Sequence, residues 1–172
     1  QACCATADGT PLPVQQRYAY LWVCTAPPAR HPLFALPEFD APQRRIVDCG
    51  GIGVATSGLR VVENFLDMAH FPYVHAQYLG QPPHTEVRPY DVAVVDGELR
   101  ATNCVFWQPR PGPTATEGGD VAYEYAVSHP YAASLRKLPS ETDGGERGAF
   151  SLLIIASPEQ ETTCRVFLLT TV

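Results

Sequence analysis

One stretch of the chain gathers polar side chains beside an apolar stripe: Val61-Val62-Glu63-Asn64-Phe65-Leu66-Asp67-Met68-Ala69-His70-Phe71-Pro72-Tyr73-Val74-His75. Apolar residues that recur at positions i, i+3, i+4 and i+7 predict an amphipathic helix. The apolar positions are Val62, Phe65, Leu66 and Ala69. The opposite side carries Arg60, Glu63, Asn64, Asp67 and His70. We therefore expect one helix face that packs on a core and one that carries polar groups.

The proline in this stretch predicts where the helix ends. Ser57 is a suitable N-cap, and Pro72 lacks the N–H that a helix interior needs and clashes with the carbonyl four residues back. We expect one long helix from Ser57 that ends or kinks near His70. On a straight helix, His70 and His75 would point about 140° apart. A kink at Pro72 is thus the expected means of bringing the two imidazoles together.

Two imidazoles and one carboxylate on one face of a metal suit non-haem Fe(II), because they leave positions open for O₂. His70, His75 and the nearby Asp67 supply these groups. A plainer interpretation is that the polar stripe is a solvated helix face and that His75 is hydrogen-bonded in a turn. A zinc hydrolase of the H-E-x-x-H type is disfavoured, because the histidines are five residues apart with no Glu between them.

Composition limits the class of protein. The chain has 172 residues, of which 45% are hydrophobic and 17% charged, which suits one globular domain over residues 1–172. The net charge is −6 and no basic run is present, which argues against nucleic-acid binding. No apolar stretch approaches the roughly 20 residues of a membrane span, and no signal segment opens the chain. We expect a cytoplasmic protein without a membrane span.

Six cysteines occur without C-x-x-C pairs or regular spacing, so neither a zinc site nor a disulfide framework is indicated. We expect most of them to be buried free thiols. The adjacent Cys3 and Cys4 have no further ligand nearby, so a metal site there is not expected.

The remainder of the chain favours an antiparallel sheet. Alternating or β-branched segments predict strands at residues 14–24, 44–56, 92–95, 99–107, 121–127, 149–157 and 164–172. Asp96-Gly97 is a strong turn signal between two of them, whereas residues 130–148 indicate a loop. The predicted fold class is α+β, with about seven strands and one long helix against them. Side chains expected to line an apolar pocket are Phe106, Trp107, Leu153 and Phe167.

A resemblance sharpens this interpretation. The spacing Asn64-x-x-Asp67-x-x-His70-x-x-x-x-His75 resembles the mononuclear-iron motif of Rieske-type non-haem iron oxygenases. Within that family, the sequence is similar to the type that includes vanillate O-demethylase and aromatic ring-hydroxylating α-subunits. The residues that carry this similarity are Asn-Phe-Leu-Asp-Met-Ala-His-Phe-Pro-Tyr-Val-His. Residues 13–24 and 157–172 also resemble strands of that family. The resemblance implies a helix-grip, START-like fold.

The resemblance also implies roles for residues. His70 and His75 match iron ligands, Asp67 matches the aspartate that relays electrons from a neighbouring subunit's Rieske cluster, and Asn64 matches a polar residue close to the iron. The implied cofactors are Fe(II), with a [2Fe–2S] Rieske cluster and an NAD(P)H-dependent reductase supplied from outside this chain. The implied partners are O₂, a small apolar or aromatic substrate, a reductase or ferredoxin, and two further copies in a homotrimer. The implied reaction is hydroxylation or demethylation.

Two family features are missing from this sequence. The chain contains neither the C-x-H nor the C-x-x-H ligands of a Rieske cluster. The family's third iron ligand, a carboxylate, follows the last strands, where no residue of this chain matches it. The sequence is therefore expected to represent a catalytic domain that is incomplete at the C-terminus and lacks the Rieske domain, inactive alone. The alternative is a metal-free START-like module that binds an apolar ligand.

Overall fold

A seven-stranded antiparallel sheet forms the centre of the computed structural model, which describes residues 4–30, 32–139 and 149–172. The strand order is β5-β11-β10-β9-β8-β7-β6. The bounds are β5 Ile46–Val54, β6 Asp91–Val95, β7 Glu98–Gln108, β8 Gly119–His129, β9 Ala132–Lys137, β10 Phe150–Gln160 and β11 Thr163–Thr171. All neighbouring strands of this sheet are antiparallel. The predicted α+β class and the strand number are confirmed.

The sequence predicts two hairpins well, β6–β7 and β10–β11. Asp96 and Gly97 join β6 to β7 with φ values of 53° and 84°, which is the left-handed backbone that a two-residue hairpin turn needs. The hairpin of β10 and β11 also lies where it was predicted, although both strands reach further toward the turn than expected. Local residue choice therefore determines these two connections.

Two strand predictions were wrong. Residues 130–148 were predicted as a loop, but β9 occupies Ala132–Lys137 and pairs with both β8 and β10. Its polar residues are placed by long-range pairing, which no local pattern reveals. Residues 14–24 were predicted as one strand, but they form a hairpin of β3 Val14–Arg17 and β4 Tyr20–Val23. Tyr18 and Ala19 make the turn with φ values of 51° and 62°.

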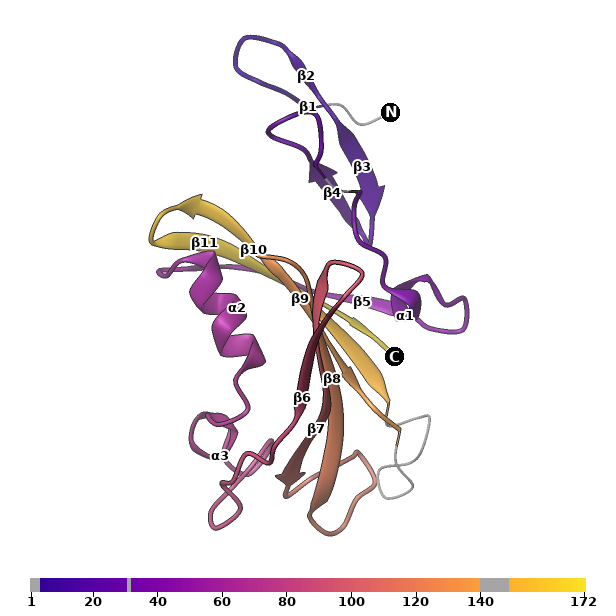
Figure 1. Cartoon of the computed structure of the whole chain (residues 1–172), viewed down its shortest axis with the longest axis vertical. Helices are drawn as coiled ribbons and strands as arrows, with labels where there is room; N and C mark the ends of the chain where they lie inside the picture. The colour runs from indigo at the N-terminus through magenta and orange to yellow at the C-terminus, as the bar shows by residue number, and fades with distance from the viewer. Residues whose placement is uncertain (1–3, 31, 140–148) are drawn as a thin grey trace.

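Different helices and strands pack on the two faces of the sheet, as Figure 1 shows. The inner face carries α2 (Gly58–Leu66) and α3 (Phe71–Val74), and the outer face carries α1 (Pro37–Asp40) and the β3–β4 hairpin. The small β1 (Cys4–Ala5) and β2 (Pro11–Leu12) pair lies beyond that hairpin. The inner core contains Met68, Phe71, Ala101, Cys104, Phe106, Val121, Tyr123, Tyr125 and Leu135. The outer core contains Tyr18, Leu36, Phe39, Leu153 and Leu169.

The five described cysteines are free thiols, as predicted, but only Cys104 and Cys164 are buried, so the prediction that most are buried was wrong. Cys3 lies outside the described residues. Burial raises the pKa of Cys104 to about 11, which keeps it a thiol.

Within the described ranges, no helix is long and apolar enough to cross a membrane.

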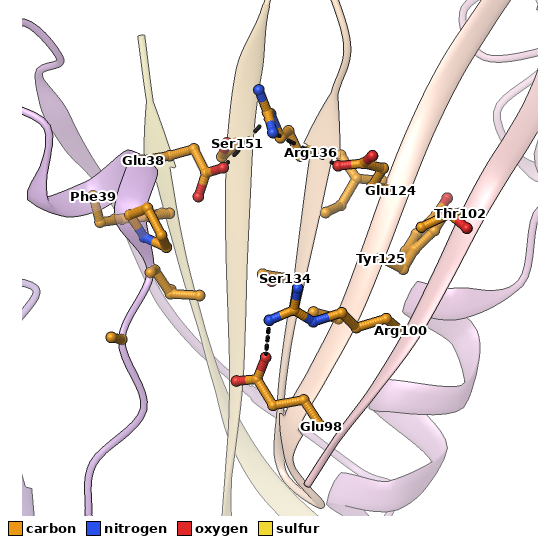
Figure 2. A pocket seen from close by; sticks show the side chains of 15 residues that line it. Glu38, Phe39, Glu98, Arg100, Thr102, Glu124, Tyr125, Ser134, Arg136 and Ser151 are labelled. Atoms are coloured by element: carbon orange, nitrogen blue, oxygen red, sulfur yellow. Dashed lines mark hydrogen bonds and ion pairs between the residues drawn. The ribbon is translucent and has the colours of Figure 1, made fainter. Parts of the chain in front are cut away.

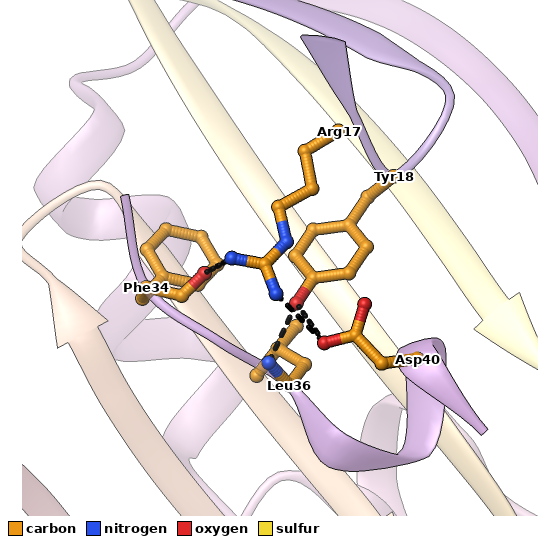
Figure 3. A network of polar contacts seen from close by, with 5 residues as sticks. All are labelled: Arg17, Tyr18, Phe34, Leu36 and Asp40. Carbon is orange, nitrogen blue, oxygen red and sulfur yellow. Dashed lines mark hydrogen bonds and ion pairs between the residues drawn. The ribbon is translucent and has the colours of Figure 1, made fainter. Parts of the chain in front are cut away.

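A polar network fastens the N-terminal hairpin to the outer face (Figure 3). The Tyr18 hydroxyl accepts a hydrogen bond from the Leu36 backbone N–H at 2.6 Å and donates to Asp40 at 3.3 Å. The Arg17 guanidinium pairs with Asp40 at 2.7 Å and donates to the Phe34 carbonyl. Tyr18 and Leu36 are both buried, so water cannot replace this hydroxyl.

Tyr18→Phe should therefore destabilise the protein by about 1–3 kcal/mol, because it leaves the buried Leu36 N–H without an acceptor. Tyr20→Phe is the matched control. The Tyr20 hydroxyl bonds Asp48, whose exposed carboxylate can turn to water instead. Urea unfolding of the three proteins measures the difference, and equal losses in the two variants would contradict the role given to Tyr18.

Candidate metal centre

The helix that carries the polar stripe is short and well anchored. Ser57 caps α2 through its Oγ, which accepts from the Arg60 N–H at 3.4 Å, and Val62 is buried beneath it. A Cβ at position 58 would lie 2.8 Å from the Tyr131 ring and 3.2 Å from the Ala156 carbonyl. Gly58, a poor residue for a first turn, is thus explained by close packing on β10.

The helix ends earlier than the sequence predicts. It stops at Leu66, the segment from Asp67 to His70 forms a turn, and α3 then begins at Phe71. The prediction of one long helix with a kink at Pro72 was wrong. Pro72 instead lies in the first turn of α3, where no N–H is needed and its fixed φ suits helix entry.

This break brings the two histidines together. His70 immediately precedes α3 and His75 immediately follows it, and their ring centroids are 5.1 Å apart with an interplanar angle of 61°. His75 has φ −112° and ψ 36°, outside the helical range. The 140° divergence expected on a straight helix therefore does not arise, and the two rings lie close together.

Asp67 holds this turn and faces one of the histidines. Its Oδ1 accepts from the Ala69 N–H at 2.8 Å, and its Oδ2 lies 3.3 Å from His70 Nδ1. With the proton on Nδ1, the ring donates to the carboxylate and keeps the Nε2 lone pair for a metal. The predicted relation of Asp67 to His70 is thus present.

The site lies on a hydrophobic floor. Met68 and Phe71 are buried, and the Phe71 ring contacts the Phe106 ring edge-on, with the ring centroids 5.5 Å apart. The His70 side chain is 14% exposed. Burial, with a smaller contribution from the charge of His70, lowers the pKa of His75. Both effects favour the neutral imidazole, which is the form that binds a metal.

The rest of the polar stripe behaves as a solvated face. Arg60 and Glu63 form an exposed ion pair, which adds little stability. Together with Asn64 and Asp67 they line a shallow, open depression on α2. Asn64 is exposed, and its backbone carbonyl accepts from the Asp67 N–H. Its predicted place near a metal stays a prediction.

The donor set fits Fe(II) in part. Two imidazoles with an orienting carboxylate match two of three positions in a facial arrangement. Across residues 4–30, 32–139 and 149–172, no group of three or more His, Cys, Asp or Glu residues could hold a metal ion. A third ligand is therefore not provided by the described part of the chain.

The predicted pocket wall is only partly correct. Phe106 is buried on the inner face beneath α3. Leu153 belongs to the outer core, and Phe167 contacts Tyr20 on that side, so these two cannot line one pocket with Phe106. Trp107 follows Phe106 along the strand and stacks on His84, with the ring centroids 3.9 Å apart. The face of each side chain depends on strand register, which a one-residue error reverses.

The side chain that the sequence interpretation missed is Tyr125. It projects from β8 into the inner core and meets Phe65 of α2 edge-on, with ring centroids 6.2 Å apart. The alternation of Tyr123 and Tyr125 is visible in the sequence. Nothing in that alternation says which face lies under the helix.

A second pocket lies on the outer face, between α1 and the sheet (Figure 2). Arg136 lies between Glu38, at 3.5 Å, and Glu124, at 3.7 Å, while Arg100 pairs with Glu98. These contacts fasten α1 to β8 and β9. Because the pocket is on the face opposite α2 and α3, it is separate from the histidine pair.

Known proteins share sequence with most of this chain. Residues 54–171 match the family described as "Vanillate O-demethylase oxygenase C-terminal domain". A curated relative, the "Probable methylxanthine N7-demethylase NdmC" of Pseudomonas sp. (strain TJI-51), is 47% identical over 134 residues. That match covers 76% of this chain and 47% of the relative, so the chain spans about half the length of this relative.

Solved structures share the fold. Pseudomonas putida CBB5 NdmA with caffeine has a TM-score of 0.73 at 19% identity, over 98% of this chain and 48% of that one. Dicamba monooxygenase bound to 3,6-dichlorosalicylic acid has a TM-score of 0.73 at 21% identity, over 96% of this chain and 52% of that one. With the family match over most of the sheet and both helices of the site, the chain belongs to the vanillate O-demethylase type of Rieske oxygenase catalytic domains.

Proposed function

We propose that this chain is the iron-binding part of an oxygenase that removes a methyl group from a nitrogen of a small heteroaromatic compound. The observation that carries the proposal is the turn between α2 and α3, where His70 and His75 approach to 5.1 Å and Asp67 faces His70. The name of the 47% identical relative supports N-demethylation as the reaction and a methylxanthine as the substrate class.

In this proposal each group has a defined task. His70 and His75 hold the metal, and Asp67 fixes the tautomer and orientation of the His70 ring. When bound, Fe(II) together with O₂ and two electrons supplies the oxidation of a methyl C–H bond. Met68, Phe71 and Phe106 form an apolar floor beneath the site.

The electrons are proposed to come from a Rieske cluster and a reductase outside the described residues. The Asp67 side chain is 45% exposed although the neighbouring His70 is largely covered. An exposed carboxylate beside a metal ligand can be contacted by another subunit. This exposure supports the assignment of Asp67 as the relay between copies in a trimer, with Asn64 as a polar neighbour on the same surface.

A metal-free module that binds an apolar ligand is the other candidate from the sequence. It would not require two imidazoles to approach each other, nor a carboxylate to orient one of them. The convergence of the rings therefore favours the iron proposal. Binding of Fe(II) separates the two.

The first test is metal binding. His70→Ala and His75→Ala should each weaken Fe(II) binding by more than about 100-fold, because loss of a ligand exceeds the 10–100-fold effect of losing an outer partner. His84→Ala, which removes an exposed imidazole that stacks on Trp107, should leave binding unchanged. Anaerobic titration with Fe(II) measures the affinities. Equal binding by all three variants would defeat the site assignment.

The second test concerns the orienting carboxylate. Asp67→Asn should weaken Fe(II) binding by about 10–100-fold, since the amide accepts a weaker hydrogen bond from His70 and no longer raises its basicity. Glu63→Gln makes the same chemical change on the exposed face of α2 and should have no effect. A matching loss in both variants would assign the change to overall charge instead of to the contact with His70.

The third test is the reaction. With Fe(II), O₂, a [2Fe–2S] protein and its reductase, the protein should release one formaldehyde for each 7-methylxanthine consumed. His75→Ala serves as the inactive control. Consumption of 7-methylxanthine with a hydroxylated ring and no formaldehyde would replace demethylation by hydroxylation. No turnover by protein with bound iron under these conditions would contradict the proposed reaction.

A further inference from the structure

Tyr125 carries a buried hydroxyl group without a partner. The residue is 3% exposed, and among the described residues its hydroxyl has no hydrogen-bond partner, which is also the case for the hydroxyls of Ser151 and Thr171. The contrast with Tyr123, on the same strand and the same face, is direct. The Tyr123 hydroxyl accepts a hydrogen bond from the Gln108 side chain at 2.6 Å. One of two neighbouring tyrosines therefore has a partner within the fold and the other does not.

The position of Tyr125 places this hydroxyl beside the candidate metal centre. Its ring lies edge-on against Phe65, in the last turn of α2, and it shares the inner core with Met68 and Phe71. Asp67, the residue that faces His70, directly follows that helix. The unpaired hydroxyl thus belongs to a side chain that packs under the end of α2, where the turn with the two histidines begins.

Folding alone does not explain the hydroxyl. A buried hydroxyl without a partner is unfavourable, and phenylalanine would fill nearly the same volume without that cost. An unpaired buried polar group in a native protein calls for a specific explanation, and a functional role is one such explanation. Burial, with smaller contributions from surrounding groups that include Asp67, raises the pKa of Tyr125, so the group stays protonated and can donate a hydrogen bond.

We propose that the Tyr125 hydroxyl is a substrate-selecting donor, which binds a carbonyl oxygen or ring nitrogen of a heteroaromatic compound lying over the inner face. This inference rests on the proposed function and names the feature of the substrate that the site selects. The other side chains nearby, Phe65, Met68 and Phe71, are apolar and give contact area without orientation. A single donor among them fixes which edge of a flat ring faces the metal.

The physical consequence is selectivity. A site built to hydrogen-bond a polar group discriminates against an analogue that lacks it, because the protein's own buried group then stays unpaired. Loss of the hydroxyl should remove this discrimination. Two bicyclic N-methyl compounds make a matched pair of ligands. 7-Methylxanthine has carbonyl acceptors, and 1-methylindole has none.

The experiment compares the wild-type protein, loaded with Fe(II), with Tyr125→Phe and Tyr123→Phe. Calorimetry gives the dissociation constants of both ligands, and thermal unfolding without ligand gives Tm. Tyr125→Phe should weaken 7-methylxanthine binding about tenfold, which is the loss of one hydrogen bond to a buried group. It should change 1-methylindole binding less than twofold and raise Tm by about 2–4 °C.

Tyr123→Phe is the control for the loss of a tyrosine hydroxyl on this face. It should lower Tm, because the Gln108 amide loses its acceptor, and it should leave the ratio of the two affinities unchanged. A fall in Tm for Tyr125→Phe would show that the hydroxyl is structural and would overturn the inference. Equal loss of both ligands, or of neither, would also overturn it, as would a wild-type protein that does not bind 7-methylxanthine.

The outcome separates this inference from the proposed function. Protein that binds Fe(II) through His70 and His75, but whose ligand selectivity does not depend on Tyr125, keeps the iron proposal and loses the role of Tyr125. Protein that binds no Fe(II) loses the iron proposal whatever the ligand affinities are. The iron titration and the affinity ratio are independent measurements on the same samples.

Discussion

The arrangement of the site depends on the turn that Asp67 closes. One carboxylate oxygen accepts from the Ala69 N–H and the other lies 3.3 Å from His70 Nδ1, so the backbone of the turn and the His70 ring are held by the same group. Without the turn, α2 would run on into α3, and histidines five residues apart would diverge. With it, His70 and His75 stand at the two ends of a single helical turn. The separation of their rings thus follows from a local backbone feature.

The turn is itself supported by burial. Met68, within the turn, and Phe71, directly after it, are both buried in the inner core, and each such side chain contributes about 1.5–3 kcal/mol of hydrophobic stabilisation. Close approach of the next loop adds to this, because a Cβ at Gly80 would meet the Pro72 backbone at 2.9 Å and the Phe106 ring at 3.0 Å. Packing on the sheet, more than the exposed ion pairs of α2, holds the turn in place.

The sequence predicts those features that local chemistry determines. Asp96-Gly97 gives its hairpin because the turn requires left-handed backbone at both positions, and Ser57 gives the start of α2 because its hydroxyl can cap a helix. Asp67, His70 and His75 come together because all three lie within nine residues. In contrast, β9 depends on two partner strands that are distant in sequence. The faces of Leu153 and Phe167 depend on register, which the residues themselves do not reveal.

The two faces of the sheet also differ in how they satisfy their polar groups. On the outer face, Arg136 between Glu38 and Glu124 is partly exposed, so water can complete the hydrogen bonds that these groups leave open. On the inner face, Gln108 and Tyr123 pair with each other out of reach of solvent. The Tyr125 side chain is buried on that face, and its hydroxyl, like those of Ser151 and Thr171, has no partner among the described residues. A hydroxyl that is buried without a partner is unfavourable unless a bound ligand supplies the acceptor. Tyr125, more than any charged group of the outer pocket, should therefore respond to the choice of ligand.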